Sequence, residues 1–251
     1  MPNTITGEAD PILAKVRKLL AKAEDAAATP AEAETYNAKA SALMAEYGID
    51  RALLAAADPD SDIVGDQVVM LDAPYARDKA TLLSGLAHAL RCRSVLRTRY
   101  PDGVKELSLH LFGYDSDLLR TDVLFTSLLV QATVGMVRTP APFGESVAAF
   151  RRSWLAGFTQ AVVTRVGDAE RKAAGDAERK AATPTQTSVA LVLADRSATV
   201  EDALAQRYPR LGSARTRTLS GSGLADGWAA GQRADIGGSK LTRPSRGALG
   251  G

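Results

Sequence analysis

The chain has 251 residues, of which 45% are hydrophobic, 24% charged and 5% aromatic, a composition typical of soluble globular proteins. No apolar run approaches the roughly 20 residues of a membrane-spanning helix. The N-terminal segment also lacks the basic start and apolar centre of a secretory signal. The single cysteine excludes an intramolecular disulfide. We therefore expect a cytoplasmic protein that does not bind membranes.

Charge is nearly balanced, with 31 Lys and Arg against 29 Asp and Glu, but it is distributed unevenly. Residues 1–66 carry 6 basic and 12 acidic side chains, whereas residues 207–251 carry 8 basic and 2 acidic ones. A basic segment of this kind attracts a polyanion such as nucleic acid, or the acidic end of its own chain. A solvated tail without a dedicated partner is the third interpretation.

The first fifty residues predict two antiparallel helices. Asp10, which precedes a proline, is a favourable helix start, and an apolar stripe at helical spacing follows it. Thr29 and Glu32 have the spacing of a capping box for a second helix. Gly48 stands where a helix-terminating residue is expected. We therefore predict a helical hairpin over residues 9–50.

Three fragments of this hairpin carry a resemblance to a known family: KVRKLLAKA near its start, EAETYNAKA at its centre and LMAEYGID at its end. They resemble the helical hairpin of the domain of unknown function 2786 family. Members often carry a second uncharacterised domain, which residues 78–240 resemble through FRRSWLAGF, ALVL, RYPRL and AAGQRADIG. The resemblance implies a fold and a domain order, and it supplies no catalytic residues.

The segment after the hairpin is expected to connect two parts of the chain. Residues 51–67 are rich in Ala and Asp, and we interpret them as a linker. A short strand is expected at Val68–Leu71, and Asp78 is expected to start an amphipathic helix.

A β-hairpin is predicted next. Its strands, Arg93–Tyr100 and Val104–Phe112, flank a Pro-Asp-Gly turn in which proline fixes φ and glycine permits positive φ. Leucines alternate with polar residues along the second strand, which indicates one buried and one exposed face.

Two long helices are expected after this β-hairpin. The first runs from Asp115 to about Val137, and we interpret Asp115 and Asp117 as capping residues. The second begins near Glu145 and continues into a perfect duplication of GDAERKAA at residues 167–182. Eight residues turn a helix by about 800°, so the two copies cannot share one buried seam. We interpret them as a solvated helical extension or a flexible insertion.

The remaining elements complete an α+β assignment. A short apolar run at Val189–Leu193 predicts a strand in the centre of the sheet, and a helix is expected over Leu224–Ala234. Residues 241–251 are expected to be disordered. The predicted fold is an N-terminal two-helix hairpin plus a mixed domain, residues 68–240, with a small antiparallel-containing sheet and two long helices.

The chain lacks the common signatures of catalysis. Zinc sites use three or four ligands, and the candidates are limited to His88, Cys92 and His110, which we interpret as structural residues. No nucleophile elbow, dinucleotide fingerprint or phosphate loop is found. We expect no catalytic residues, metal or cofactor, and we find no evidence for a small-molecule substrate. A protein that is not an enzyme is favoured, and an enzyme of a type without these signatures is the third hypothesis.

A basic strand is the remaining functional candidate. Arg93, Arg97 and Arg99 alternate along the first strand of the β-hairpin, and Lys105 follows its turn. Guanidinium groups on one strand face suit phosphate oxygens, so nucleic acid is the expected partner. The alternatives are a solvated outer face and a protein–protein adaptor. In the adaptor, the N-terminal hairpin docks a partner helix near its exposed lysines Lys15, Lys18 and Lys22.

Overall fold

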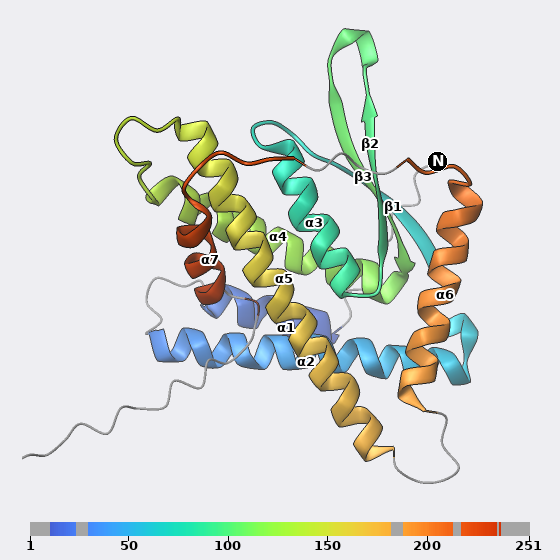
Figure 1. Cartoon of the computed structure of the whole chain (residues 1–251). Coiled ribbons are helices and arrows are strands. Elements are labelled where there is room, and N and C mark those ends of the chain that lie inside the picture. Colours follow the sequence, from blue (N-terminus) through green and yellow to red (C-terminus); the bar gives the residue numbers. More distant parts are fainter. Residues whose placement is uncertain (1–10, 24–29, 182–187, 213–216, 235, 237–251) are drawn as a thin grey trace, which may run out of the picture.

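The computed structural model describes residues 11–23, 30–181, 188–212, 217–234 and 236. Within these residues it contains seven α-helices and a three-stranded antiparallel sheet (Figure 1), which confirms the α+β prediction. None of the described helices is both long and apolar enough to cross a bilayer. The predicted caps Asp10 and Thr29 and the predicted tail 241–251 lie outside the described residues.

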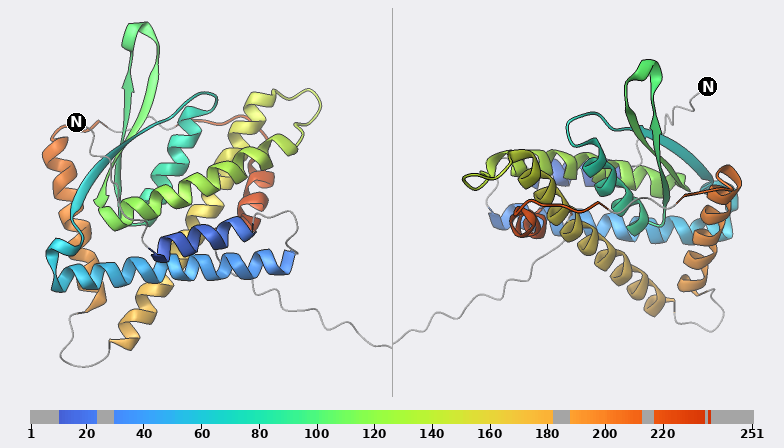
Figure 2. Two further views of the ribbon diagram at one scale, coloured as in Figure 1. Left: turned by 180° about the vertical axis from the view of Figure 1, so that it is seen from behind. Right: turned by 45° about the horizontal axis from the view of Figure 1, so that its top comes forward.

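The N-terminal helices α1 (Pro11–Ala23) and α2 (Pro30–Ala57) form the predicted hairpin (Figure 2). Leu13, Val16 and Leu20 of α1 are buried, as are Met44 and Tyr47 of α2. These side chains join the main hydrophobic core, so the apolar stripe of α1 is covered within the chain.

Two boundaries of the N-terminal region differ from the prediction. Helix α2 does not end at Gly48 but continues to Ala57, and a 3-10 turn at Pro59–Ser61 leads directly into strand β1 (Val64–Met70). The expected linker over residues 51–67 is therefore helix, turn and strand. The terminating role given to Gly48 is wrong because its backbone stays helical against a packed neighbour.

The sheet has the order β1-β3-β2, so β3 (Glu106–Tyr114) is central and β2 (Arg93–Arg99) is an edge strand. The β2–β3 pair is the predicted β-hairpin, and its register places Leu96 opposite Leu109 and Arg97 opposite Ser108. The end of this hairpin projects beyond the helices (Figures 1 and 2). We call the projecting part, residues 97–106, the ribbon.

Helices cover both faces of the base of the sheet. Helix α3 (Ala76–Ala89) lies between the sheet and α5 (Val147–Lys180), and α4 (Asp115–Arg138) packs beneath them. Trp154 and Phe158 of α5 stack with ring centroids 5.4 Å apart. The short helix α7 (Leu224–Arg233) lies against α5, where Gly227 contacts the Trp154 backbone too closely for any Cβ.

Helix α6 (Val189–Arg207) covers the opposite face of the sheet, and it replaces the strand predicted at Val189–Leu193. Val189, Val192 and Val200 are buried, whereas Leu191 is 60% exposed. The run is therefore amphipathic at helical spacing rather than buried on both faces. A short apolar run fits either structure, and this one continues into a helix of 19 residues.

Candidate nucleic-acid interface

The ribbon carries most of the basic residues that the sequence singled out. Alternation along β2 places Arg97 and Arg99 on one face, with Arg99 exposed and Arg97 partly exposed, and Lys105 is exposed just before β3. Arg99 pairs in register with Glu106. Among the described residues, no ion pair within 4.0 Å involves Arg97 or Arg99. Their guanidinium groups can therefore meet an anion outside the chain.

Arg93 is separated from this group. Its Nε lies 3.3 Å from the Glu201 carboxylate of α6, and its Nη1 donates a 3.2 Å hydrogen bond to the Cys92 carbonyl. The position is on the predicted face, but α6 covers that end of the sheet. Arg93 is thus part of the contact between α6 and the sheet. The other three predicted basic residues, Arg97, Arg99 and Lys105, lie on the ribbon.

The ribbon tip exposes apolar and aromatic surface beside the charges. Tyr100 is 64% exposed and Val104 is 65% exposed. The turn between them uses positive φ at Asp102 (49°) and Gly103 (80°), which reverses the chain within three residues. The tip therefore presents basic groups next to a ring that can contact a base or a sugar.

A hydrogen-bonded chain of three side chains holds α6 on the sheet, and the sequence did not reveal it. His110 is 2% exposed; its Nε2 lies 2.6 Å from Asp66 Oδ2 and its Nδ1 lies 2.7 Å from Tyr208 Oη. The Phe112 ring packs edge-on against Tyr208. The alternation along β3 placed His110 on a sheet face, but only the position of α6 brings Tyr208 to it.

The candidate metal and nucleophile residues do not meet. His88 is exposed on α3, Cys92 is fully buried, and His110 is held by Asp66 and Tyr208. Burial raises the pKa of the Cys92 thiol to about 12, with a further contribution from Asp117. Within the described part of the chain no cluster of His, Cys, Asp and Glu has the arrangement of a metal site.

The comparison with protein families decides the identity of the N-terminal hairpin. Residues 12–51 match the family described as "Protein of unknown function (DUF2786)". The chain carries a DUF2786 hairpin. This confirms the resemblance of the three sequence fragments. No curated protein and no solved structure matches the chain.

The exposed side of helix α1 in the DUF2786 hairpin is basic. Lys15, Lys18 and Lys22 of α1 are exposed, and the Lys22 ammonium lies 5.5 Å from the centre of the Tyr36 ring. The apolar side of the same helix is buried in the core. A partner of this surface would therefore meet lysines rather than an apolar stripe.

The DUF2786 hairpin also contacts a buried cluster of charges. Arg120 of α4 is fully buried, and its guanidinium lies against the backbone of Gly48, where a Cβ would overlap it. Arg120 Nη1 donates a 2.7 Å hydrogen bond to Asp117, and its Nη2 pairs with Glu170. Burial lowers the pKa of Arg120, but the Glu170 and Asp117 carboxylates outweigh this effect and raise it above its ordinary value.

Further charges extend this cluster towards the sheet. Arg91 Nη1 lies 2.8 Å from Glu170, and Arg196 Nη2 lies 2.7 Å from Asp62. Asp62 accepts hydrogen bonds from the Ser116 amide and hydroxyl at the start of α4. The charge cluster thus contains three carboxylates and three guanidinium groups: Asp62, Asp117, Glu170, Arg91, Arg120 and Arg196.

Two interpretations of the sequence are corrected by the charge cluster. Asp117 does not cap α4, because it pairs with Arg120 and Arg196, and the cap comes from Asp62 instead. The first octapeptide copy is not wholly solvated, because its Glu170 is buried. Its counterpart Glu178 in the second copy is exposed. The advance of about 80° per copy turns one glutamate inwards and the other outwards.

Proposed function

We propose that this protein is a non-enzymatic nucleic-acid-binding protein whose ribbon contacts phosphates through Arg97, Arg99 and Lys105. The observation that carries the proposal is the pair Arg97 and Arg99, which have no acidic ion-pair partner among the described residues and lie on a projecting β-hairpin. A two-stranded ribbon fits the major groove of a duplex. Guanidinium groups bind phosphate oxygens through charge-assisted hydrogen bonds.

The charge on the ribbon sets the expected strength of binding. Three basic side chains share the ribbon with Asp102 and Glu106, so phosphate contacts are few. For three contacts, the logarithm of the association constant should fall with the logarithm of salt concentration at a slope of about −2.7 on duplex DNA. The proposed protein is therefore an accessory factor of modest, salt-sensitive affinity, and its proposed location is the cytoplasm.

Fluorescence anisotropy with labelled single- and double-stranded DNA, measured over a salt series, tests the proposal. The full chain is compared with the double variant Arg97→Glu/Arg99→Glu, which should weaken binding about tenfold or more and reduce the salt slope by about 2. Arg93 is left intact because it pairs with Glu201. Absent or salt-independent binding by the unaltered chain would overturn the proposal.

The triple variant Lys15→Glu/Lys18→Glu/Lys22→Glu is the matched control. It reverses exposed charges on α1, away from the ribbon, and it should leave DNA binding within about twofold because these side chains make no proposed phosphate contact. Loss of binding in this variant, with the ribbon variant unaffected, would place the interaction on the DUF2786 hairpin. That result would overturn the ribbon as the DNA contact. The adaptor alternative would instead be favoured if the full chain bound no DNA and the lysine changes weakened binding to a protein partner.

A further inference from the structure

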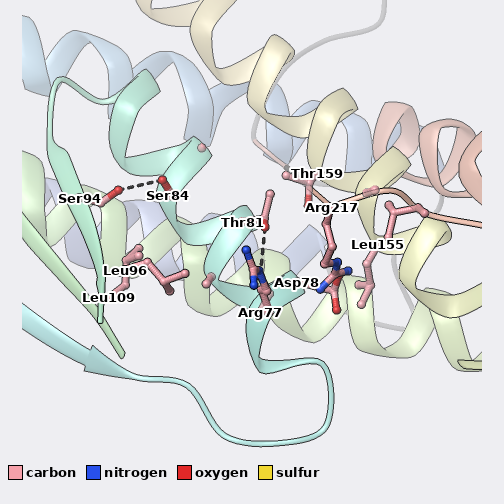
Figure 3. A pocket seen from close by; sticks show the side chains of 14 residues that line it. Arg77, Asp78, Thr81, Ser84, Ser94, Leu96, Leu109, Leu155, Thr159 and Arg217 are labelled. Atoms are coloured by element: carbon pink, nitrogen blue, oxygen red, sulfur yellow. Dashed lines mark hydrogen bonds and ion pairs between the residues drawn. The ribbon is translucent and has the colours of Figure 1, made fainter. Parts of the chain in front are cut away.

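A cleft lies at the base of the β2–β3 hairpin, on the sheet face opposite Arg97 and Arg99. It has a volume of about 570 Å³ and is bounded by α3, α5, the sheet and the segment 217–219 (Figure 3). Leu96 and Leu109 of the sheet and Leu155 of α5 form its apolar walls. Pockets of this size and largely apolar lining are typical of small-ligand sites.

Polar groups converge on these apolar walls. The hydroxyls of Thr81, Ser84, Ser94 and Thr159 line the cleft, and Ser84 and Ser94 share a 2.8 Å hydrogen bond at one end (Figure 3). The Thr81 hydroxyl donates a 3.0 Å hydrogen bond to the Arg77 carbonyl, so it can still accept one from a ligand, and the serine pair has one hydroxyl proton left to donate. The lining therefore suits a flat ligand with apolar faces and a polar edge.

The opposite end of the cleft is basic. Arg77 and Arg217 line it, and an adjoining hollow of about 360 Å³ adds Arg152 and the Tyr75 ring. The buried Asp78 pairs with Arg217, and the residues that line this end carry three guanidinium groups and one carboxylate. The net charge at this end is positive, and guanidinium groups match phosphate or carboxylate oxygens.

The position of the cleft connects it to the ribbon. Strand β2 is an edge strand, so its outer side has no neighbouring strand. Its alternation directs Ser94 and Leu96 to the cleft and Arg97 and Arg99 to the other face. A polymer held by the ribbon reaches the cleft by passing around this single edge.

We propose that the cleft binds one unstacked nucleotide, with its phosphate at Arg77, Arg152 and Arg217 and its base between Leu96, Leu109 and Leu155. The assignment of this nucleotide to a polynucleotide rests on the proposed function of the ribbon. Single-stranded segments offer such bases, since their faces and edges are free of pairing.

Isothermal titration of the full chain with AMP and dTMP, and separately with inorganic phosphate and adenosine, tests the cleft. Arg152→Glu reverses a charge at the basic end and should weaken nucleotide binding about tenfold or more. Ala156→Phe places a ring among the lining residues and should weaken it to a similar degree. Arg151→Glu, at the preceding residue of α5 and outside the lining, is the matched control and should change affinity less than about twofold.

The outcomes separate this proposal from the ribbon. Equal weakening by Arg151→Glu and Arg152→Glu, or phosphate binding as tight as AMP binding and unaffected by Ala156→Phe, would overturn the nucleotide site. Absent nucleotide binding alongside ribbon-dependent DNA binding would overturn the cleft alone. Nucleotide binding without any DNA binding would support a nucleotide site in the cleft and would overturn the assignment of that nucleotide to a polynucleotide. Circular dichroism checks that Ala156→Phe folds, and Arg152→Glu tests the site independently of that result.

Discussion

The guanidinium of Arg120 lies against the backbone of Gly48, so a residue of α4 occupies the space that a side chain on α2 would need. Gly48 belongs to the DUF2786 hairpin, and Arg120 is held from the other side by Asp117 and Glu170. The contact therefore links the hairpin to the charge cluster in the rest of the chain.

Gly48→Ala should destabilise the protein by about 2 kcal/mol, because the added methyl displaces a buried guanidinium and overpacking costs roughly 1–3 kcal/mol. Urea unfolding followed by circular dichroism measures the loss. Gly175→Ala is the control, since a Cβ there meets only ordinary van der Waals contact on helix α5. It should stabilise by about 0.5–1 kcal/mol through helix propensity. Equal effects of the two changes would contradict the close contact.

The octapeptide duplication provides a paired test of the charge cluster. Glu170→Gln removes a carboxylate from the fully buried Arg120 and should cost about 3 kcal/mol, because an uncompensated buried charge remains. Glu178→Gln makes the same change at the equivalent, exposed position and should have little effect. Chemical denaturation of both variants checks this expectation. A similar loss of unfolding free energy in each would show that Glu170 is not part of a buried charge cluster.

The Cys92 thiol should be unreactive in the folded protein. Its pKa is raised to about 12 by burial and by Asp117, so the thiolate is not populated at pH 8. The buried sulfur is also inaccessible to a reagent in solution. A thiol-reactive chromophore should label it only in urea. Rapid labelling without denaturant would contradict the burial of this side chain.

The same shift predicts a pH dependence of stability. The unfolded thiol ionises near pH 9, whereas the folded thiol stays protonated to about pH 12. The unfolded state then binds fewer protons, so stability falls as pH rises through this window. Comparing the pH slope of the unaltered chain with that of Cys92→Ala isolates the contribution, because the other titrating groups are shared. Identical slopes would argue against the raised pKa.

Tyr208→Phe should destabilise the contact between α6 and the sheet. It removes the hydroxyl 2.7 Å from His110 Nδ1 and leaves a buried ring nitrogen without its partner, a loss of about 1–3 kcal/mol. Thermal unfolding gives the size of the effect, and hydrogen exchange should show faster opening at the end of α6. Tyr100→Phe, on the exposed ribbon tip, is the control and should be neutral.

Local chemistry made several elements predictable. The Pro-Asp-Gly turn and the alternating leucines specified the β2–β3 hairpin, and helical spacing specified α1. Such signals depend on residues that are close together in the chain, so they can be recognised without knowledge of the tertiary structure. The basic pair Arg97 and Arg99 was visible for the same reason.

Two predictions are wrong because the structure of the segment depends on residues that are distant in the sequence. Gly48 has the sequence context of a helix end, yet α2 continues to Ala57, and the absence of a side chain at Gly48 leaves room for Arg120 of a distant helix. Val189–Leu193 has the composition of a strand, yet it is helical because Val189 and Val192 face the interior and Leu191 does not.

The sequence by itself determined the DUF2786 hairpin, the β-hairpin with its basic face and the absence of common catalytic motifs, since each depends on residues close together in the chain. Only the tertiary structure decided which charges are buried, that Arg93 is bound by Glu201, and that α3, α5 and the sheet enclose a cleft. These properties arise where segments far apart in sequence meet, and burial or pairing there changes what the same side chain can do.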